Sequence, residues 1–153
     1  NDKTEENNAL NENKNLTKDI EYLTTDNDGN KYKIIAKLGE TSTKDSNILK
    51  LTKVDGIVSS KIQGDIKISS EFAEYNYSNQ NSKFYENVKI YYDNKEISCD
   101  NLDLNISKNI AVAYNNVIIN DNNSILKADN ITMDLLTKDI KINSNKKIKV
   151  LSN

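Results

Sequence analysis

The side chains of this chain that could perform chemistry are carboxylates, lysines and one cysteine. Three closely spaced carboxylate pairs have residue types suited to the acid–base pair of a glycosidase: Asp19/Glu21, Asp26/Asp28 and Asp100/Asp103. All three lie in polar or turn-forming stretches, and the chain has no tryptophan that could serve as an aromatic platform for a sugar. We therefore predict that the protein is not an enzyme.

The residue inventory also excludes several metal and redox sites. The chain has no histidine, and Cys99 is its only cysteine. This rules out His- or Cys-based zinc sites, Ser-His-Asp triads and an intramolecular disulfide. We interpret Cys99 as a small buried hydrophobic residue. Asp26–Asn30 resembles half of a calcium-binding loop but lacks its bidentate glutamate, so we interpret it as a turn and expect no cofactor or metal.

The charge pattern argues against two classes of partner. The net charge is −2 without a strong block of either sign, so neither a nucleic-acid surface nor a patch for anionic membranes is predicted. All 21 basic residues are lysine, which weakens the case for a phosphate clamp. No apolar stretch approaches the roughly 20 residues of a membrane span. No signal peptide is visible either, so we expect any targeting segment to lie upstream of Asn1 or to have been removed.

The elements that must position these side chains are short β-strands. Residues 1–19 are almost wholly polar and predict a flexible leader. From Ile20 onward, apolar and polar residues alternate in short runs that are separated by Asn-, Asp- and Gly-containing turns. No convincing helical period follows residue 20. We predict one all-β domain over residues 20–151, with antiparallel strands in a meander.

A repeat organises the second half of the chain. Segment 68–90 recurs 29 positions later as segment 97–119, and the dipeptides Asn87-Val88 and Asn116-Val117 are among the matching positions. A third, degenerate copy covers residues 126–142. Each unit is a strand, a polar turn and a second strand. Stacked hairpins of similar length predict an elongated ladder with open edges at both ends.

Residues that alternate toward one side of these hairpins form a candidate inner face. Either they interdigitate as a closed sandwich core, which residue types alone favour, or they line a lengthwise groove. The candidates are Tyr75, Tyr77, Phe84, Val88, Ile90, Leu102, Leu104, Ile106, Val117, Ile119, Ile131 and Met133.

The repeats resemble the OstA-type repeat of the lipopolysaccharide transport proteins. The resemblance is carried by segments 74–78 with 87–90, 103–107 with 116–119, and 127–135 with 137–140. The LptC branch is the most similar, because strands like its own stand at Gly29–Ala36 and Ile48–Val54 ahead of the repeats. Two features depart from the family pattern. Glu86 and Asn115 stand where a glycine often precedes Asn-Val, and the amino-terminal membrane helix typical of LptC is missing, which indicates an ectodomain or a soluble relative.

This resemblance implies an elongated antiparallel β-jellyroll of the OstA-like, twisted-boat form. It implies a periplasmic location, with anchoring to the inner membrane through an upstream helix that is not in this chain. It also implies binding of lipopolysaccharide, through acyl-chain contact with a subset of the inner-face residues. The lipid would arrive from an inner-membrane ABC transporter and pass to an LptA-like protein.

The resemblance further implies that partners add to the sheet edges. The amino-terminal edge, at residues 31–38 with Tyr32 and Ile34, would meet a transporter of the LptF/LptG type. The carboxy-terminal edge would join the LptA-like protein through Ile140, Ile142, Ile148 and Val150. Lysines 141, 147 and 149 have a simpler interpretation as protection against edge-to-edge aggregation. Two alternatives stay open: a soluble LptA-like family member, and a structural β-repeat such as a surface adhesin module without lipid.

Overall fold

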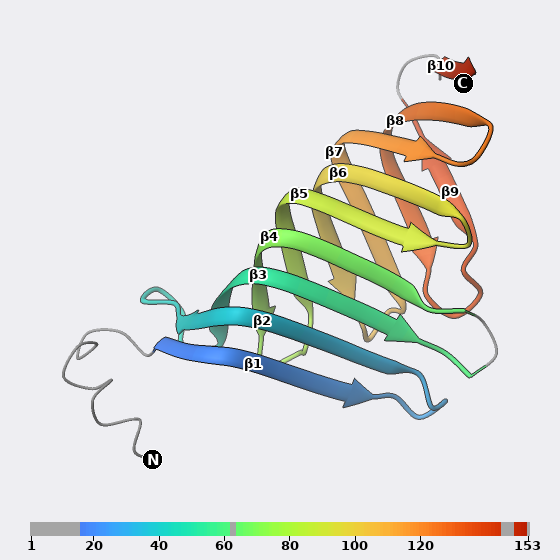
Figure 1. Cartoon of the computed structure of the whole chain (residues 1–153). Helices are drawn as coiled ribbons and strands as arrows, with labels where there is room; N and C mark the ends of the chain where they lie inside the picture. Colours follow the sequence, from blue (N-terminus) through green and yellow to red (C-terminus); the bar gives the residue numbers. More distant parts are fainter. Residues whose placement is uncertain (1–15, 62–63, 145–148, 153) are drawn as a thin grey trace.

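The computed structural model describes residues 16–61, 64–144 and 149–152, which form one antiparallel sheet of ten strands (Figure 1). The strands are β1 (Leu16–Thr25), β2 (Lys31–Thr41), β3 (Ile48–Ser59), β4 (Ile66–Asn76), β5 (Ser82–Tyr92), β6 (Lys95–Asn105), β7 (Ile110–Asn120), β8 (Ser124–Asp134), β9 (Ile140–Asn143) and β10 (Lys149–Ser152).

Sequence order and spatial order coincide from β1 to β8, since each strand pairs with the next. On its other side β8 pairs with two short strands. Its residues 130–133 pair with β9, and its residues 124–127 pair with β10, so these strands occupy two halves of one strand position. The prediction of an all-β antiparallel jellyroll with open edges is confirmed.

The sheet folds back on itself because the long strands bend near their middle (Figure 1). At the bend, every odd-numbered strand from β1 to β7 has residues with left-handed backbone. In β5 and β7 two such residues oppose a single residue of the next strand and form a β-bulge, which bends and twists the strand. We call this bend the corner, and its left-handed residues are Asp19, Lys53, Glu86, Asn87, Asn115 and Asn116.

Asn and Asp side chains make the turns between the strands. Asp121 Oδ1 accepts hydrogen bonds from the backbone N–H groups of Asn123 and Ser124, at 2.9 and 3.0 Å. Asp134 Oδ1 does the same for Leu136 and Thr137. These backbone hydrogen bonds lower the pKa of both carboxyls. Such side-chain turns explain how a chain with no proline and four glycines reverses direction repeatedly.

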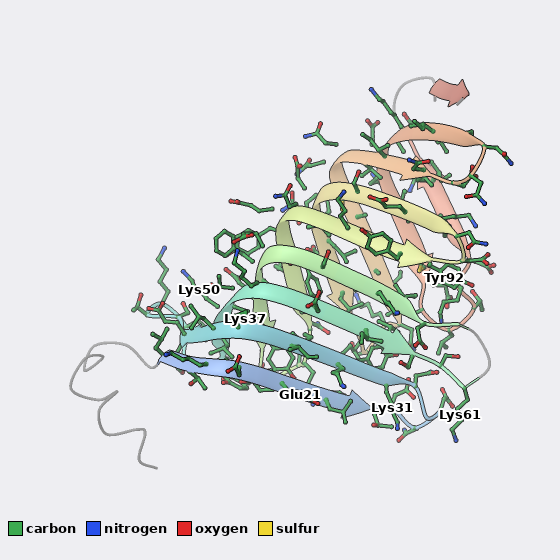
Figure 2. All side chains as sticks on the ribbon, viewed as in Figure 1. Glu21, Lys31, Lys37, Lys50, Lys61 and Tyr92 are labelled. Carbon is green, nitrogen blue, oxygen red and sulfur yellow. The ribbon has the colours of Figure 1, made fainter. Side chains whose placement is uncertain are left out.

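One hydrophobic core lies between the two layers, while charged residues cover the outside. Alternation along each strand separates the faces; Leu49 and Leu51 are buried and Lys50 between them is exposed. Figure 2 shows Lys37 and Lys50 pointing away from the ribbon. Some outer charges pair across strands, as in Lys53–Glu71 at 3.0 Å. Such exposed pairs contribute little stability, and their main effect here is to favour one register.

Two sequence-based boundaries are wrong at the amino-terminal end. Strand β1 begins at Leu16, so Leu16–Asp19 belong to the sheet and not to the leader predicted over residues 1–19. The remainder of that leader lies outside the described residues. The amino-terminal edge is β1, because β2, which contains the predicted edge 31–38, lies between β1 and β3. The alternation in 31–38 reveals a strand but not its position in the sheet.

Candidate functional site

The interior is built from strands that are not neighbours in the sheet. The ring of Phe84 on β5 lies against Gly56 on β3, where an added Cβ would be 3.3 Å from Phe84 Cζ. Gly56 pairs with Ile68 and Phe84 pairs with Ala73, which lie on opposite sides of the bend in β4, so the contact crosses the interior from one layer to the other. Phe84 is 1% exposed. A side chain at position 56 would therefore force the layers apart or displace the ring.

Two small cavities remain between the layers. One, of about 10 Å³, lies behind the aromatic residues of β1 and β4 and is lined in part by Tyr22, Tyr75, Phe84 and Ile106. The other, of about 20 Å³, has an entirely apolar lining of Val58, Ile66, Ile68, Ile90, Ile97, Leu102, Leu104, Ala111, Ala113, Ile131, Met133 and Leu135. Each has space for about one water molecule. Of the two arrangements left open by the sequence, the structure has the closed sandwich.

Three tyrosines form a cluster on the side of the interior opposite the corner. We call Tyr22, Tyr75 and Tyr77 the tyrosine cluster. The rings of Tyr22 and Tyr75 stack with centroids 4.6 Å apart, and both meet the ring of Tyr77 edge-on at 5.8 Å. The Tyr22 and Tyr77 hydroxyls form a 2.9 Å hydrogen bond. Burial, followed by the Tyr77 hydroxyl, raises the pKa of Tyr22 above its usual range. Tyr22 is in line with Ile68 across β2 and β3, and Tyr75 lies on the other side of the bend in β4, so the cluster joins the two layers.

A second contact crosses the same side. The Tyr32 hydroxyl on β2 lies 3.2 Å from Asp26 Oδ2 and 3.2 Å from Asn109 Oδ1, in the turn after β6. Burial and then the Asp26 carboxylate raise the pKa of Tyr32 to about 12. The same carboxylate accepts hydrogen bonds from backbone N–H groups in its own turn. We call the side that carries the tyrosine cluster and the Tyr32–Asn109 contact the seam.

A buried lysine lies in the turn after β8. Lys138 is 5% exposed, and its Nζ donates a 2.9 Å hydrogen bond to the carbonyl of Leu135, which lines the larger cavity. Burial lowers the pKa of Lys138, against the opposing effect of Asp65 and Asp134. The backbone N–H of Leu135 also donates to the carbonyl of Asn109. These bonds fix the turn over the end of the cavity.

The structure gathers most of the predicted inner-face residues into this one core. Tyr77 and Ile106 differ from the rest. Tyr77 lies in the turn after β4 and is 45% exposed, so placing it on the inner face was wrong. Ile106 is half-buried, just beyond β6. The buried members are Tyr75, Phe84, Val88, Ile90, Leu102, Leu104, Val117, Ile119, Ile131 and Met133.

The residues predicted at the two sheet edges also differ from one another in where they lie. Tyr32 and Ile34, predicted at the amino-terminal edge, are buried and line the smaller cavity. Ile140 and Ile142 of β9 are half-buried against the core at the carboxy-terminal edge. Val150 belongs to β10 and pairs with Leu126 through the backbone. Ile148 lies outside the described residues.

Sequence reasoning missed the roles of Tyr22 and Lys138. The alternation of Ile20 and Tyr22 could have placed the tyrosine on the inner face, since both side chains point the same way along β1. Nothing in the sequence distinguishes Lys138 from the exposed lysines. Its burial depends on how the β8–β9 turn folds over the cavity.

Four of the six candidate carboxylates, Glu21, Asp26, Asp100 and Asp103, are engaged in structural contacts. Asp100 Oδ2 accepts a 2.6 Å hydrogen bond from Asn116 Nδ2, and Asp103 Oδ1 accepts one from the Tyr114 hydroxyl at 3.2 Å. Glu21 lies 3.8 Å from Lys33. Cys99 is buried, and burial raises the pKa of its thiol to about 12.

The described residues provide neither a metal-binding cluster nor a membrane-spanning helix. Residues 16–61, 64–144 and 149–152 contain no group of three or more His, Cys, Asp or Glu side chains that could hold a metal ion. Within the same ranges, no helix is long and apolar enough to cross a membrane.

Comparison with known proteins finds similar solved structures and one matching family. One of the similar structures is that of LptH from Pseudomonas aeruginosa, described as the LptA-homologous periplasmic component of the conserved lipopolysaccharide transport device. It shares 8% identity, covers 90% of this chain and 93% of its own, and superposes with a TM-score of 0.35. A search of curated proteins finds no match. Residues 1–150 match the family described as lipopolysaccharide-assembly, LptC-related, and the chain belongs to that family.

Proposed function

We propose that this protein is a periplasmic bridge component that receives lipopolysaccharide from an inner-membrane ABC transporter and passes it to an LptA-like protein. Membership of the LptC-related family supports a role in lipopolysaccharide assembly. The observation that carries the proposal is the continuous apolar interior between two layers that terminates in open strand edges within the described residues. In the full-length protein, an upstream helix would hold the domain at the inner membrane.

The binding energetics favour partial burial of the lipid. Each acyl methylene that leaves water contributes ~0.8 kcal/mol, so several fully enclosed chains would dissociate slowly. A conduit must instead release its cargo. Contact of a few methylenes with inner-face residues such as Phe84, Leu104 and Ile119 when the layers part, together with pushing by the transporter ATPase, satisfies both requirements.

The edges support the proposed handover. Strand addition to an open edge gives a continuous sheet between two proteins, and thus a continuous apolar path. We place the LptA-like partner at β9 and β10, and the LptF/LptG-type transporter at β1. This assignment replaces residues 31–38 with β1 at the amino-terminal edge.

Lipid contact is tested with the single methionine. Met133 is 5% exposed and lines the larger cavity, so photo-methionine would place a small photoreactive group inside the core. With purified lipopolysaccharide present, we expect a lipid adduct on the peptide that contains residue 133. The matched control is the double variant Met133→Leu/Thr132→Met, which moves the label by one residue to the opposite face of β8. If both folded proteins formed the lipid adduct equally, or neither formed it, the proposal that the interior binds lipid would be contradicted.

The edge assignment is tested by crosslinking to the partners. A photoreactive residue at Lys141, on β9, should capture the LptA-like protein, and one at Leu23, on β1, should capture the transporter. Lys50, exposed on the inner strand β3, is the control position. Capture of either partner from Lys50 as efficiently as from the edges would contradict strand addition.

The closed interior favours a second candidate function, a structural β-repeat module that binds no lipid. Cavities of about 10 and 20 Å³ leave no preformed space for an acyl chain. A hydrophobic fluorescent dye separates the candidates: the native conduit takes up the dye when its layers part, whereas a permanently closed sandwich does not.

A further inference from the structure

We propose that the tyrosine cluster is a latch, and that an acyl chain enters the interior through the seam when this latch opens. The inference rests on the proposed function and adds the place of entry. It concerns a conformational step of the domain itself, independent of either edge partner.

Entry requires opening because the two cavities between the layers of the described residues are too small for an acyl chain. A cavity with space for one water molecule cannot hold a chain of several methylenes. The smaller cavity lies directly behind the tyrosine cluster, and Tyr22 and Tyr75 form part of its lining. Leu104 lines both cavities. A chain that passed the cluster would therefore move along one apolar path into the core.

The two long sides of the sandwich differ in how they are closed. At the corner the backbone of each long strand runs from one layer to the other, so the layers cannot part there (Figure 1). At the seam, contacts across the interior are made by side chains: the tyrosine cluster and the hydroxyl of Tyr32 against Asn109. The corner can act as the hinge, and the seam as the side that opens.

The chemistry of the cluster suits a contact that breaks and re-forms. Tyr77 is 45% exposed and belongs to a turn, so its displacement breaks no strand pairing. Its hydrogen bond to Tyr22 is exposed, and water can replace it. A methylene chain that slides between the rings substitutes ring–methylene contacts for ring–ring contacts, while the hydroxyls stay in water.

Thiol accessibility measures this opening without lipid. Val58 lines both cavities, is 2% exposed, and lies near the end of β3 that is remote from the corner. A Val58→Cys reporter in a Cys99→Ala background therefore reports on the seam. Native Cys99 pairs with Val88 next to the corner and reports on the hinge. We compare alkylation rates of the two thiols under native conditions, with and without Tyr77→Ala.

We expect Tyr77→Ala to accelerate alkylation of Val58→Cys about tenfold and to leave Cys99 nearly unchanged. Tyr77→Phe, which loses only the hydroxyl, should give a smaller acceleration of the same kind. Equal acceleration at both thiols would indicate general loosening and would overturn the latch. An unchanged rate at Val58→Cys would overturn it too.

A reversible lock connects the latch to lipid entry. In the Cys99→Ala background, Tyr22→Cys and Tyr77→Cys are joined by a short thiol linker that a reductant cleaves. With photo-methionine at Met133, we expect no lipopolysaccharide adduct while the linker is intact and recovery of the adduct after cleavage. An adduct in the locked protein would place entry elsewhere and overturn the latch, while the proposed function would stand. If the unmodified protein forms no adduct, the proposed function fails, and the entry route fails with it.

Discussion

The residues at the corner carry backbone conformations that most side chains avoid. Glu86 and Asn115 stand where the OstA-type repeat often has glycine, and their φ angles are 67° and 68°. The geometry that calls for glycine is therefore retained, although the residue type is not. For an L-residue this conformation costs about 1–2 kcal/mol, and Asn tolerates it better than Glu. Glu86 is thus a site of local strain.

Replacement of this glutamate should stabilise the fold. We expect Glu86→Gly to raise the free energy of unfolding by about 0.5–1 kcal/mol, because relief of the left-handed backbone outweighs the added freedom of glycine in the unfolded chain. Urea denaturation measures the change. The control is Lys50→Gly, at an exposed strand position that is not left-handed, which should lower stability by a similar amount. A loss of stability in both variants would contradict strain at the corner.

At the scale of elements, the amino-terminal edge depends on one close approach. Ile20 of β1 packs against Gly39 of β2. A Cβ added at Gly39 would overlap Ile20 Cδ1 and lie 3.2 Å from Leu51 Cδ2. Ile20 is 8% exposed. The glycine therefore makes room for the one fully buried aliphatic side chain that β1 contributes to the described core. Attachment of the edge strand and packing of the core are coupled at this point.

This coupling predicts that Ile20→Val partly restores the stability that Gly39→Ala removes. Gly39→Ala should destabilise the protein by about 1–3 kcal/mol through overpacking. Ile20→Val removes the overlapping methyl, so the double variant should be more stable than the sum of the two single losses. Thermal or urea denaturation of the four proteins gives the coupling energy. Simple additivity would show that the new methyl group is accommodated elsewhere.

The sequence predicts the hairpins well and the position of the edges poorly. Alternation such as Leu102, Asp103 and Leu104, bounded by Asn and Asp turns, depends on neighbours in the chain and identifies strands reliably. It cannot tell that residues 31–38 lie between two strands, because that depends on residues 20–25 pairing with residues 31–36 on one side while β3 pairs on the other. Tyr22 and Tyr75 meet across the interior, and such a contact leaves no local pattern. Whether the inner face is open or closed is equally non-local.

At the scale of the whole molecule, buried weak acids make the free energy of unfolding depend on pH in the alkaline range. The thiol of Cys99 ionises near 9.0 when exposed, and burial raises its pKa to about 12. Tyr32 shows the same direction, from 10.0 to about 12. In each case the unfolded chain loses its proton first. This contribution to stability is therefore complete below the unfolded pKa and is lost as the pH rises toward the folded pKa.

The expected pH profile is specific. At constant ionic strength and with reductant present, the free energy of unfolding should fall above pH 9, with Cys99 accounting for about 1 kcal/mol at pH 10. Cys99→Ala should lower stability at neutral pH but flatten the profile between pH 9 and 10. The fall above pH 10 should persist in this variant, because the buried tyrosines remain. Identical profiles for both proteins would rule out the thiol as the source of the early decline.

The left-handed residues of the corner recur in every second strand, so a pair of neighbouring strands is the unit by which such a chain can grow. The hairpin that contains one bulged strand is a complete module of 29 residues, as the spacing of segments 68–90 and 97–119 shows. Tandem duplication of that module in the gene would insert two strands and lengthen the sheet by about 10 Å at the usual strand spacing. The duplicated segment includes the bulge residues, so the inserted strands would bend at the same position as the original ones. Ancestral chains could thus change their reach by whole hairpins while keeping both terminal edges.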